Sequence, residues 1–288
     1  GNKTLEISGS KSISNRLLIL HQLFDNILIQ NLSNSQDTQL LKAALQSDSE
    51  IIDIYHAGTA MRFLTSYYAI QEGKTVVLTG SERMKQRPIK FLVDALRDLG
   101  AEISYLENEG FPPLKISGKK ILKSTVRIPA NISSQFITSL MLIGAKLENG
   151  LQIKLEGTVT SKPYLEMTLK ILRTVGINNH WEGNVIKIQP NIHTEKHSQS
   201  IPFVVESDWS SASYYYSLAA ISRKTINLKW FKQFSLQGDS RIKEIYWKFF
   251  GVNTISEGAE SRISLLPEHY FQFPEKIVLN MNDCPDIA

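Results

Sequence analysis

The sequence contains a single cysteine, Cys284, among its 288 residues. An intrachain disulfide and a zinc site made of several cysteines are therefore excluded. The six histidines occur singly, without the spacing typical of metal ligands, so the residues predict no metal site. A single cysteine also fits a reducing compartment such as the cytoplasm.

Long apolar runs are absent as well. The longest ones, at residues 17–20 and 140–145, are far shorter than the roughly 20 residues that cross a bilayer, and no basic and apolar leader opens the chain. We therefore expect a soluble, cytoplasmic protein that binds no membrane. The net charge of +4 is too small to indicate nucleic-acid binding, and no contiguous basic stretch with interleaved aromatic residues is present.

The distribution of basic residues is more informative than their number. Several lie in the first third of the chain, beside Gly, Ser and Thr residues. This placement suits a small anionic ligand, although a solvated basic face would give the same composition. The residues are Lys11, Arg16, Arg62, Arg83, Lys85, Arg87 and Lys90.

Helical and strand periodicities alternate along the chain, which predicts an α/β protein of roughly one to two domains. The predicted helices span residues 12–23, 36–46, 59–70, 89–99, 134–147, 163–174, 210–221 and 239–250. The predicted strands span residues 27–31, 51–55, 75–79, 102–106, 114–117, 126–129, 151–155, 185–188, 203–205, 225–228, 262–265 and 276–280. Glu257-Gly258 is one of the predicted turns between them.

A loose repeat accompanies this alternation, in which a strand is followed by a short Ser/Gly/Thr segment and then by an amphipathic helix. These junctions read GSKSISNR at 9–16, HAGTAMR at 56–62, NISSQF at 131–136, TSKPY at 160–164, ESDWSSAS at 206–213 and LQGDSR at 236–241. Their recurrence predicts duplicated strand–helix units that bury their apolar faces against one another.

Helix N-termini carry unpaired N–H groups and bind anions, and small residues let a phosphate approach the backbone. Arg16 follows Ser12 by one helical turn, and Arg62 follows Gly58 similarly. Ser161 before Lys162-Pro163 predicts an N-cap. A Ser before a helix is usually only a cap, so it is the number of such junctions that points to an anion-binding α/β protein.

The motif strings themselves resemble the successive signatures of one enzyme family, in its order and at its spacings. The strings are GSKSISNR, HAGTAMRFL, LTGSERMKQRPI, SSQF, SKPY, SDWSSASYY, LQGD and DCPD. Between about residue 8 and residue 288 the chain resembles the EPSP synthases (3-phosphoshikimate 1-carboxyvinyltransferases). The resemblance implies an enolpyruvyl transferase-like two-lobe fold built from repeated βαβαββ units.

The resemblance also implies how the lobes are divided. Residues 9–206 would form one complete lobe of three units. Residues 1–8 and 207–288 would form part of the other lobe, without its opening strand and without the family's last motifs. We expect this chain alone to be inactive, and a steady-state assay on a preparation confirmed as 288 residues tests that expectation.

The implied activity is transfer of the enolpyruvyl group of phosphoenolpyruvate to the 5-hydroxyl of shikimate 3-phosphate, with release of phosphate. It belongs to the shikimate pathway of aromatic amino acid biosynthesis and implies no metal or organic cofactor. By motif, shikimate 3-phosphate would contact Lys11, Ser12, Arg16, Ser133, Ser134, Gln135, Ser161, Tyr164 and Asp286. Phosphoenolpyruvate would contact Lys11, Gly58, Arg87 and Gln135.

Catalytic roles fall to Asp286, which matches the family's proton acceptor, and to Lys11, which would stabilise charge or donate the proton to C3. Thr59 and Arg62 would support the phosphoenolpyruvate site. His56 stands where many members have Asn and adds a group that titrates near neutral pH. Phe63 replaces a common Pro beside the same site.

Two other readings remain. UDP-N-acetylglucosamine enolpyruvyl transferase has the same fold and donor, but uses a Lys-Asn pair where this chain has Lys11-Ser12. A non-catalytic phosphate- or RNA-binding module of the same architecture is the alternative from another class. We expect a monomer that binds the two small substrates and no nucleic acid.

Overall fold

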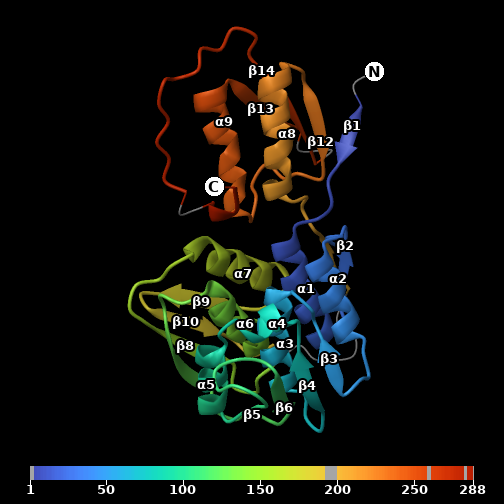
Figure 1. The fold of residues 1–288 in the computed structure, drawn as a ribbon, viewed down its shortest axis with the longest axis vertical. Coiled ribbons are helices and arrows are strands. Elements are labelled where there is room, and N and C mark those ends of the chain that lie inside the picture. Colours follow the sequence, from blue (N-terminus) through green and yellow to red (C-terminus); the bar gives the residue numbers. More distant parts are fainter. Residues whose placement is uncertain (1–2, 192–199, 258–260, 282–283, 288) are drawn as a thin grey trace. The chain divides into compact units, whose positions relative to one another are not determined.

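The computed structural model describes residues 3–191, 200–257, 261–281 and 284–287 (Figure 1). The chain forms two compact units. The larger one contains Ser14–Ile29 and Asn34–Phe203, and the smaller one contains Gly1–Ile13, Gln30–Ser33 and Val204–Ala288. The lobe boundaries expected after residues 8 and 206 stay predictions.

Two four-stranded sheets of the larger unit have the same topology. The first has the order β3-β4-β6-β5 and the second the order β7-β8-β10-β9. In both, the first pair of strands is parallel and the remaining pairs are antiparallel. The strands are β3 (Ile51–Asp53), β4 (Thr75–Thr79), β5 (Glu102–Tyr105), β6 (Leu114–Ser117), β7 (Thr125–Pro129), β8 (Leu151–Glu156), β9 (Asn179–Glu182) and β10 (Val185–Ile188).

Helices connect these strands so that each sheet is one βαβαββ unit. In the first sheet the helices are α3 (Gly58–Ala69), α4 (Glu82–Lys85) and α5 (Lys90–Leu99), and in the second they are α6 (Ser134–Gly144) and α7 (Lys162–Thr174). Eleven of the 12 residues of α3 and 10 of the 11 residues of α6 are buried. Helices buried on all sides form the interior of a unit rather than its surface.

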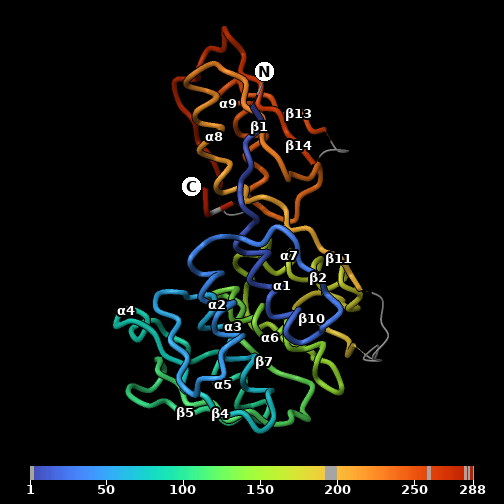
Figure 2. Tube along the Cα trace, turned by 90° about the vertical axis from the view of Figure 1, so that its right-hand side faces the viewer, coloured from blue at the N-terminus to red at the C-terminus, as the bar shows by residue number. Residues whose placement is uncertain are grey.

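A two-stranded sheet joins distant parts of the sequence. Strand β11 (Ile201–Val204) pairs with β2 (Ile27–Gln30), and Figure 2 shows them side by side. The hydrogen bonds from Ile201 N to Asn26 O and from Val205 N to Gln30 O advance in the same direction, so the pair is parallel. Helices α1 (Lys11–Leu23) and α2 (Gln36–Leu45) flank β2 in sequence.

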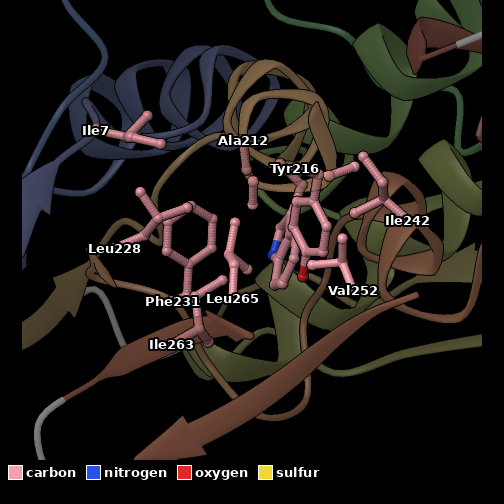
Figure 3. Packing of buried hydrophobic residues seen from close by; sticks show 12 residues of the cluster. Ile7, Ala212, Tyr216, Leu228, Phe231, Ile242, Val252, Ile263 and Leu265 are labelled. Atoms are coloured by element: carbon pink, nitrogen blue, oxygen red, sulfur yellow. The ribbon is translucent and has the colours of Figure 1, made fainter. Parts of the chain in front are cut away.

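The smaller unit repeats the four-stranded order once more, as β1-β12-β14-β13. Its strands are β1 (Thr4–Glu6), β12 (Ile226–Lys229), β13 (Val252–Glu257) and β14 (Arg262–Pro267), and its helices are α8 (Trp209–Ser222), η1 (Gly238–Arg241), α9 (Ile242–Phe250) and η3 (Pro285–Ile287). Buried Tyr216, Leu228, Phe231 and Leu265 converge between the helices and the sheet (Figure 3).

Strand β1 is followed in sequence by α1, and strand β11 by α8. The two connecting segments meet at Gly9 and Ser207. These residues form an antiparallel bridge, and Ser10 N donates to Glu206 O at 2.8 Å. A Cβ atom on Gly9 would lie 1.9 Å from the backbone oxygen of Asn31. Glycine at the first position of GSKS is therefore required by the close approach of two backbones.

Several predicted elements need correction. Residues 276–280 form no strand, and the helix predicted from Asp239 begins as the 3₁₀ turn η1. Strands β1, β9 and β13 and the short helix α4 were not predicted, and β1 supplies an opening strand. Gly258 of one predicted turn lies outside the described residues. Across the parts that the structure describes, no helix is long and apolar enough to span a membrane.

Candidate active site

The N-terminus of α3 lies between two arginines. Nη1 of Arg62, one turn into the helix, donates to Gly58 O at 2.9 Å, and Nη2 donates to Pro88 O at 3.4 Å. A Cβ atom on Gly58 would be 2.2 Å from Nη1 of Arg87 and 3.0 Å from Nη1 of Arg62. Only glycine lets both guanidinium groups approach this first helical residue.

This pair of arginines leaves positive charge uncompensated. Within residues 3–191 and the other described ranges, neither Arg62 nor Arg87 forms an ion pair with a carboxylate, and the buried Nε of Arg62 has no hydrogen-bond partner. Burial, with a smaller contribution from the charge of Arg87, lowers the pKa of Arg62 to about 10. Arg62 therefore stays charged at neutral pH, at a helix end that itself favours anions.

The N-terminus of α6 is connected to this site by Gln135. Its Nε2 donates to Thr59 Oγ1 at 3.2 Å, and its backbone N donates to Ser133 Oγ, the helix cap, at 3.4 Å. Ser134 is buried. Of the residues predicted for substrate binding, Gly58, Arg87 and Gln135 therefore lie at two neighbouring helix ends.

Arg16 of α1 is buried and reaches α7. Its Nε donates to Thr168 Oγ1 at 2.8 Å, and its Nη2 donates to Tyr164 O at 3.4 Å. Its guanidinium carbon is 5.9 Å from the centre of the Phe63 ring. Burial lowers the pKa of Arg16 to about 10, while the nearby Tyr164 raises it. A buried cation held mainly by neutral partners attracts an anionic ligand.

Hydroxyl groups tie these helices together through their N-terminal halves. Ser139 Oγ donates to Arg62 O at 2.7 Å, which joins α6 to α3. Thr138 Oγ1 lies 3.4 Å from Thr168 Oγ1, which joins α6 to α7. The helix ends that carry Gly58, Gln135 and Arg16 are thus fixed relative to one another within the larger unit.

Ser161 departs from its expected role as an ordinary cap. It precedes α7 in the left-handed conformation, with φ +53, and its side chain makes no capping hydrogen bond. Such backbone strain in a non-glycine residue costs about 1–3 kcal/mol and is concentrated at functional sites. Because the Ser161 hydroxyl does not cap α7, it is available to bind a ligand.

Four further predicted site residues are Lys11, Ser12, His56 and Asp286. Lys11 and Ser12 form the first turn of α1, and Asp286 lies in η3 of the smaller unit. His56 is exposed, and its Nδ1 is 2.6 Å from Ser81 Oγ while its ring centre is 3.8 Å from that of Tyr55.

Sequence reasoning missed two buried groups. Thr168 lies in an amphipathic helix and is buried. The sequence indicates it only by a hydroxyl residue on the apolar face of that helix. Asp239, in the LQGD string, is 7% exposed and accepts from Ser210 Oγ at 2.5 Å. Burial raises the pKa of Asp239 to about 6, with Asp286 and Asp208 adding to the effect.

Among the described residues, no three His, Cys, Asp or Glu side chains gather as a metal site would require.

The chain matches known proteins over most of its length. The family model described as EPSP synthase (3-phosphoshikimate 1-carboxyvinyltransferase) matches residues 42–288. A 3-phosphoshikimate 1-carboxyvinyltransferase of Bacteroides fragilis strain YCH46 is 44% identical over 289 aligned residues, covering 99% of this chain and 68% of that protein. One of Haemophilus influenzae strain PittGG is 35% identical, covering 99% of this chain and 70% of that protein.

A solved structure agrees with these matches at the level of fold. The EPSP synthase of Acinetobacter baumannii superposes with a TM-score of 0.68 at 20% identity, covering 96% of this chain and 68% of that one. The architecture is therefore the two-lobe enolpyruvyl transferase fold expected from the sequence, and the chain belongs to the EPSP synthase family.

Proposed function

We propose that this protein transfers the enolpyruvyl group of phosphoenolpyruvate to the 5-hydroxyl of shikimate 3-phosphate. The observation that carries the proposal is the pair Arg62 and Arg87 around Gly58, within one unit with the buried Arg16. Two separate cationic centres suit a reaction between two anions. We also propose that the protein acts in the shikimate pathway, in the cytoplasm and as a monomer.

The substrates divide between the two centres. Phosphoenolpyruvate, with its carboxylate and phosphate, binds at Gly58 and Arg87, supported by Arg62 and Thr59. Shikimate 3-phosphate binds at Ser12, Arg16, Ser133, Ser134, Ser161 and Tyr164. Gln135 faces both ligands, because its amide already reaches Thr59 at the phosphoenolpyruvate end. Arginine is suited to both because its fork of donors matches carboxylate and phosphate oxygens.

The chemistry is addition followed by elimination. The 5-hydroxyl oxygen attacks C2 of phosphoenolpyruvate, its proton passes to a base, and C3 gains a proton, giving a tetrahedral ketal phosphate. Loss of a C3 proton and of phosphate then restores the double bond. Asp286 is the proposed base, and Lys11 contacts both substrates and stabilises charge or delivers the C3 proton. Proton transfer of this kind contributes about 10²–10⁴-fold.

Calorimetry with three ligands separates this function from its alternatives. We expect the protein to bind shikimate 3-phosphate at one site and to bind neither UDP-N-acetylglucosamine nor a short RNA. Binding is the readout because it reports directly which ligand the site accepts. Preferential binding of the nucleotide sugar would favour the other enolpyruvyl transferase, and binding of RNA alone would favour a non-catalytic module.

The same titration on Arg16→Ala tests the proposed site. Loss of one hydrogen-bonded charge to a phosphate weakens binding by about 10- to 100-fold. Lys162→Ala is a matched control because Lys162 is an exposed cation that pairs with Glu166 on the same helix α7. Equal losses in both variants would contradict a specific role for Arg16.

A further inference from the structure

We propose that Thr168 is a positioning residue that aims Arg16 and Tyr164 at shikimate 3-phosphate. This inference rests on the proposed function. Thr168 lies on α7, one helical turn after Tyr164, and its side chain is fully buried. Arg16 belongs to α1 and is 152 positions away in sequence.

The donor and acceptor roles of the Thr168 hydroxyl follow from its partners. Its Oγ1 donates its single proton to Tyr164 O at 2.8 Å. The oxygen lone pairs are then left to accept, and Nε of Arg16 donates to them at 2.8 Å. Because that proton is used, the Thr138 hydroxyl at 3.4 Å must be the donor in its contact with Thr168.

This arrangement fixes a long side chain by its inner nitrogen. A bond at Nε sets the plane of the guanidinium, so the terminal nitrogens are directed before any ligand arrives. The carbonyl oxygen of Tyr164 accepts from both Thr168 and Nη2 of Arg16. Thr168 therefore contacts both residues that are predicted to bind shikimate 3-phosphate. Holding such groups in place before binding reduces the entropic cost of ordering them when the ligand binds.

A hydroxyl bonded to the carbonyl four residues earlier is common in helices, so the arginine contact is the distinguishing feature. Thr174 of the same helix donates to Lys170 O at 2.9 Å and is exposed. Thr174 contacts no arginine in any described hydrogen bond. Thr174→Val is therefore a matched control that removes the same helical bond without touching Arg16.

The experiment compares T168V, T168S and T174V by calorimetry with shikimate 3-phosphate. We expect T168V to weaken binding about 10- to 100-fold, because it removes the acceptor of a charge-assisted bond. T168S keeps the hydroxyl and should bind within about 3-fold of the parent, and T174V should bind as the parent does. Parent-like binding by T168V, or equal losses in T168V and T174V, would overturn the proposal.

A second readout does not depend on the proposed function. The Nε–H resonance of Arg16, assigned by its loss in R16K, should exchange slowly with water in the parent and in T168S and much faster in T168V. Unchanged exchange in T168V would also overturn the proposal. If the parent fails to bind shikimate 3-phosphate, the proposed function fails, whereas the exchange result still decides whether Thr168 holds Arg16. T168A replaces T168V in both measurements if the valine variant does not fold.

Discussion

Gly58 and Arg87 are so close that a methyl group on Gly58 would lie 2.2 Å from Nη1 of Arg87. Arg87 is exposed, and the colliding atom is the far end of a flexible side chain. The guanidinium can therefore move away at little cost to the fold. A substitution at Gly58 should thus affect the ligand that Arg87 binds more than it affects stability.

We predict that Gly58→Ala weakens phosphoenolpyruvate binding by about 10-fold or more, since it displaces a charge-assisted donor. The midpoint of urea unfolding should shift little. Titration of phosphoenolpyruvate in the presence of shikimate 3-phosphate measures the first effect, and circular dichroism measures the second.

The control for this prediction is the same change in an Arg87→Ala background. With the guanidinium already removed, Gly58→Ala should cause no comparable further loss, because the two effects share one cause. Additive losses would mean that the methyl group acts directly on the ligand or on α3 rather than through Arg87.

Gly9 should be far less tolerant of substitution. Its Cβ would lie 1.9 Å from the backbone oxygen of Asn31 and 2.8 Å from Cγ1 of Val205, and a backbone group cannot rotate aside. We predict that Gly9→Ala lowers the free energy of unfolding by about 3 kcal/mol or more. Ser8→Ala, at the neighbouring position, should change it by less than about 0.5 kcal/mol. Similar urea midpoints for the two variants would contradict the steric explanation.

Asp239 predicts a pH dependence of stability. Its pKa is raised from 3.8 to about 6, so the folded protein binds the proton more tightly than the unfolded chain does. Stability therefore falls as pH rises from about 4 to about 6, by at most about 3 kcal/mol from this group.

The measurement compares urea unfolding of Asp239→Asn and its parent between pH 4 and pH 7. The amide can still accept from Ser210 but has no charge to bury. The variant should gain stability relative to its parent above about pH 6 and lose this advantage near pH 4. A difference that is independent of pH would show that ionisation of Asp239 is not responsible.

Helix α8 presents apolar side chains to solvent. Tyr214, Leu218 and Ile221 are 78%, 51% and 83% exposed, and 5 of the 14 residues of α8 are buried. We predict that Ile221→Lys changes the free energy of unfolding by less than about 0.5 kcal/mol and reduces binding of an anilinonaphthalene dye. Ala219→Lys, on the buried face, should destabilise strongly. A large loss in Ile221→Lys would contradict the exposed position.

Except for the short helix α4, the helices were predictable from sequence because the signals that start a helix are local. Asp208 and Ser35 accept from backbone N–H groups of the first turn, and apolar residues recur at the helical period in the segments that follow. The strand expected at residues 276–280 was wrong because an apolar alternation there has no partner strand in the described sheets. Strand pairing is long-range, and a single segment does not encode its partner.

Site residues in local motifs could likewise be predicted, whereas those that depend on long-range contacts could not. Gly58, Gln135 and Ser161 could be named because they stand at helix starts that carry a family motif. Thr168 could not, since its importance depends on a bond to Arg16, which arrives from 152 positions away. The arginine pair shows the same limit, because a single sequence does not tell that Arg87 approaches Gly58.

The decisive measurement is a crystal structure of the protein with shikimate 3-phosphate. We expect the ligand to lie in the larger unit, with its oxygen atoms within hydrogen-bond distance of Arg16, Gln135 and Tyr164. Shikimate 3-phosphate bound at another surface, with these three side chains directed away from it, would show that the proposed site is wrong.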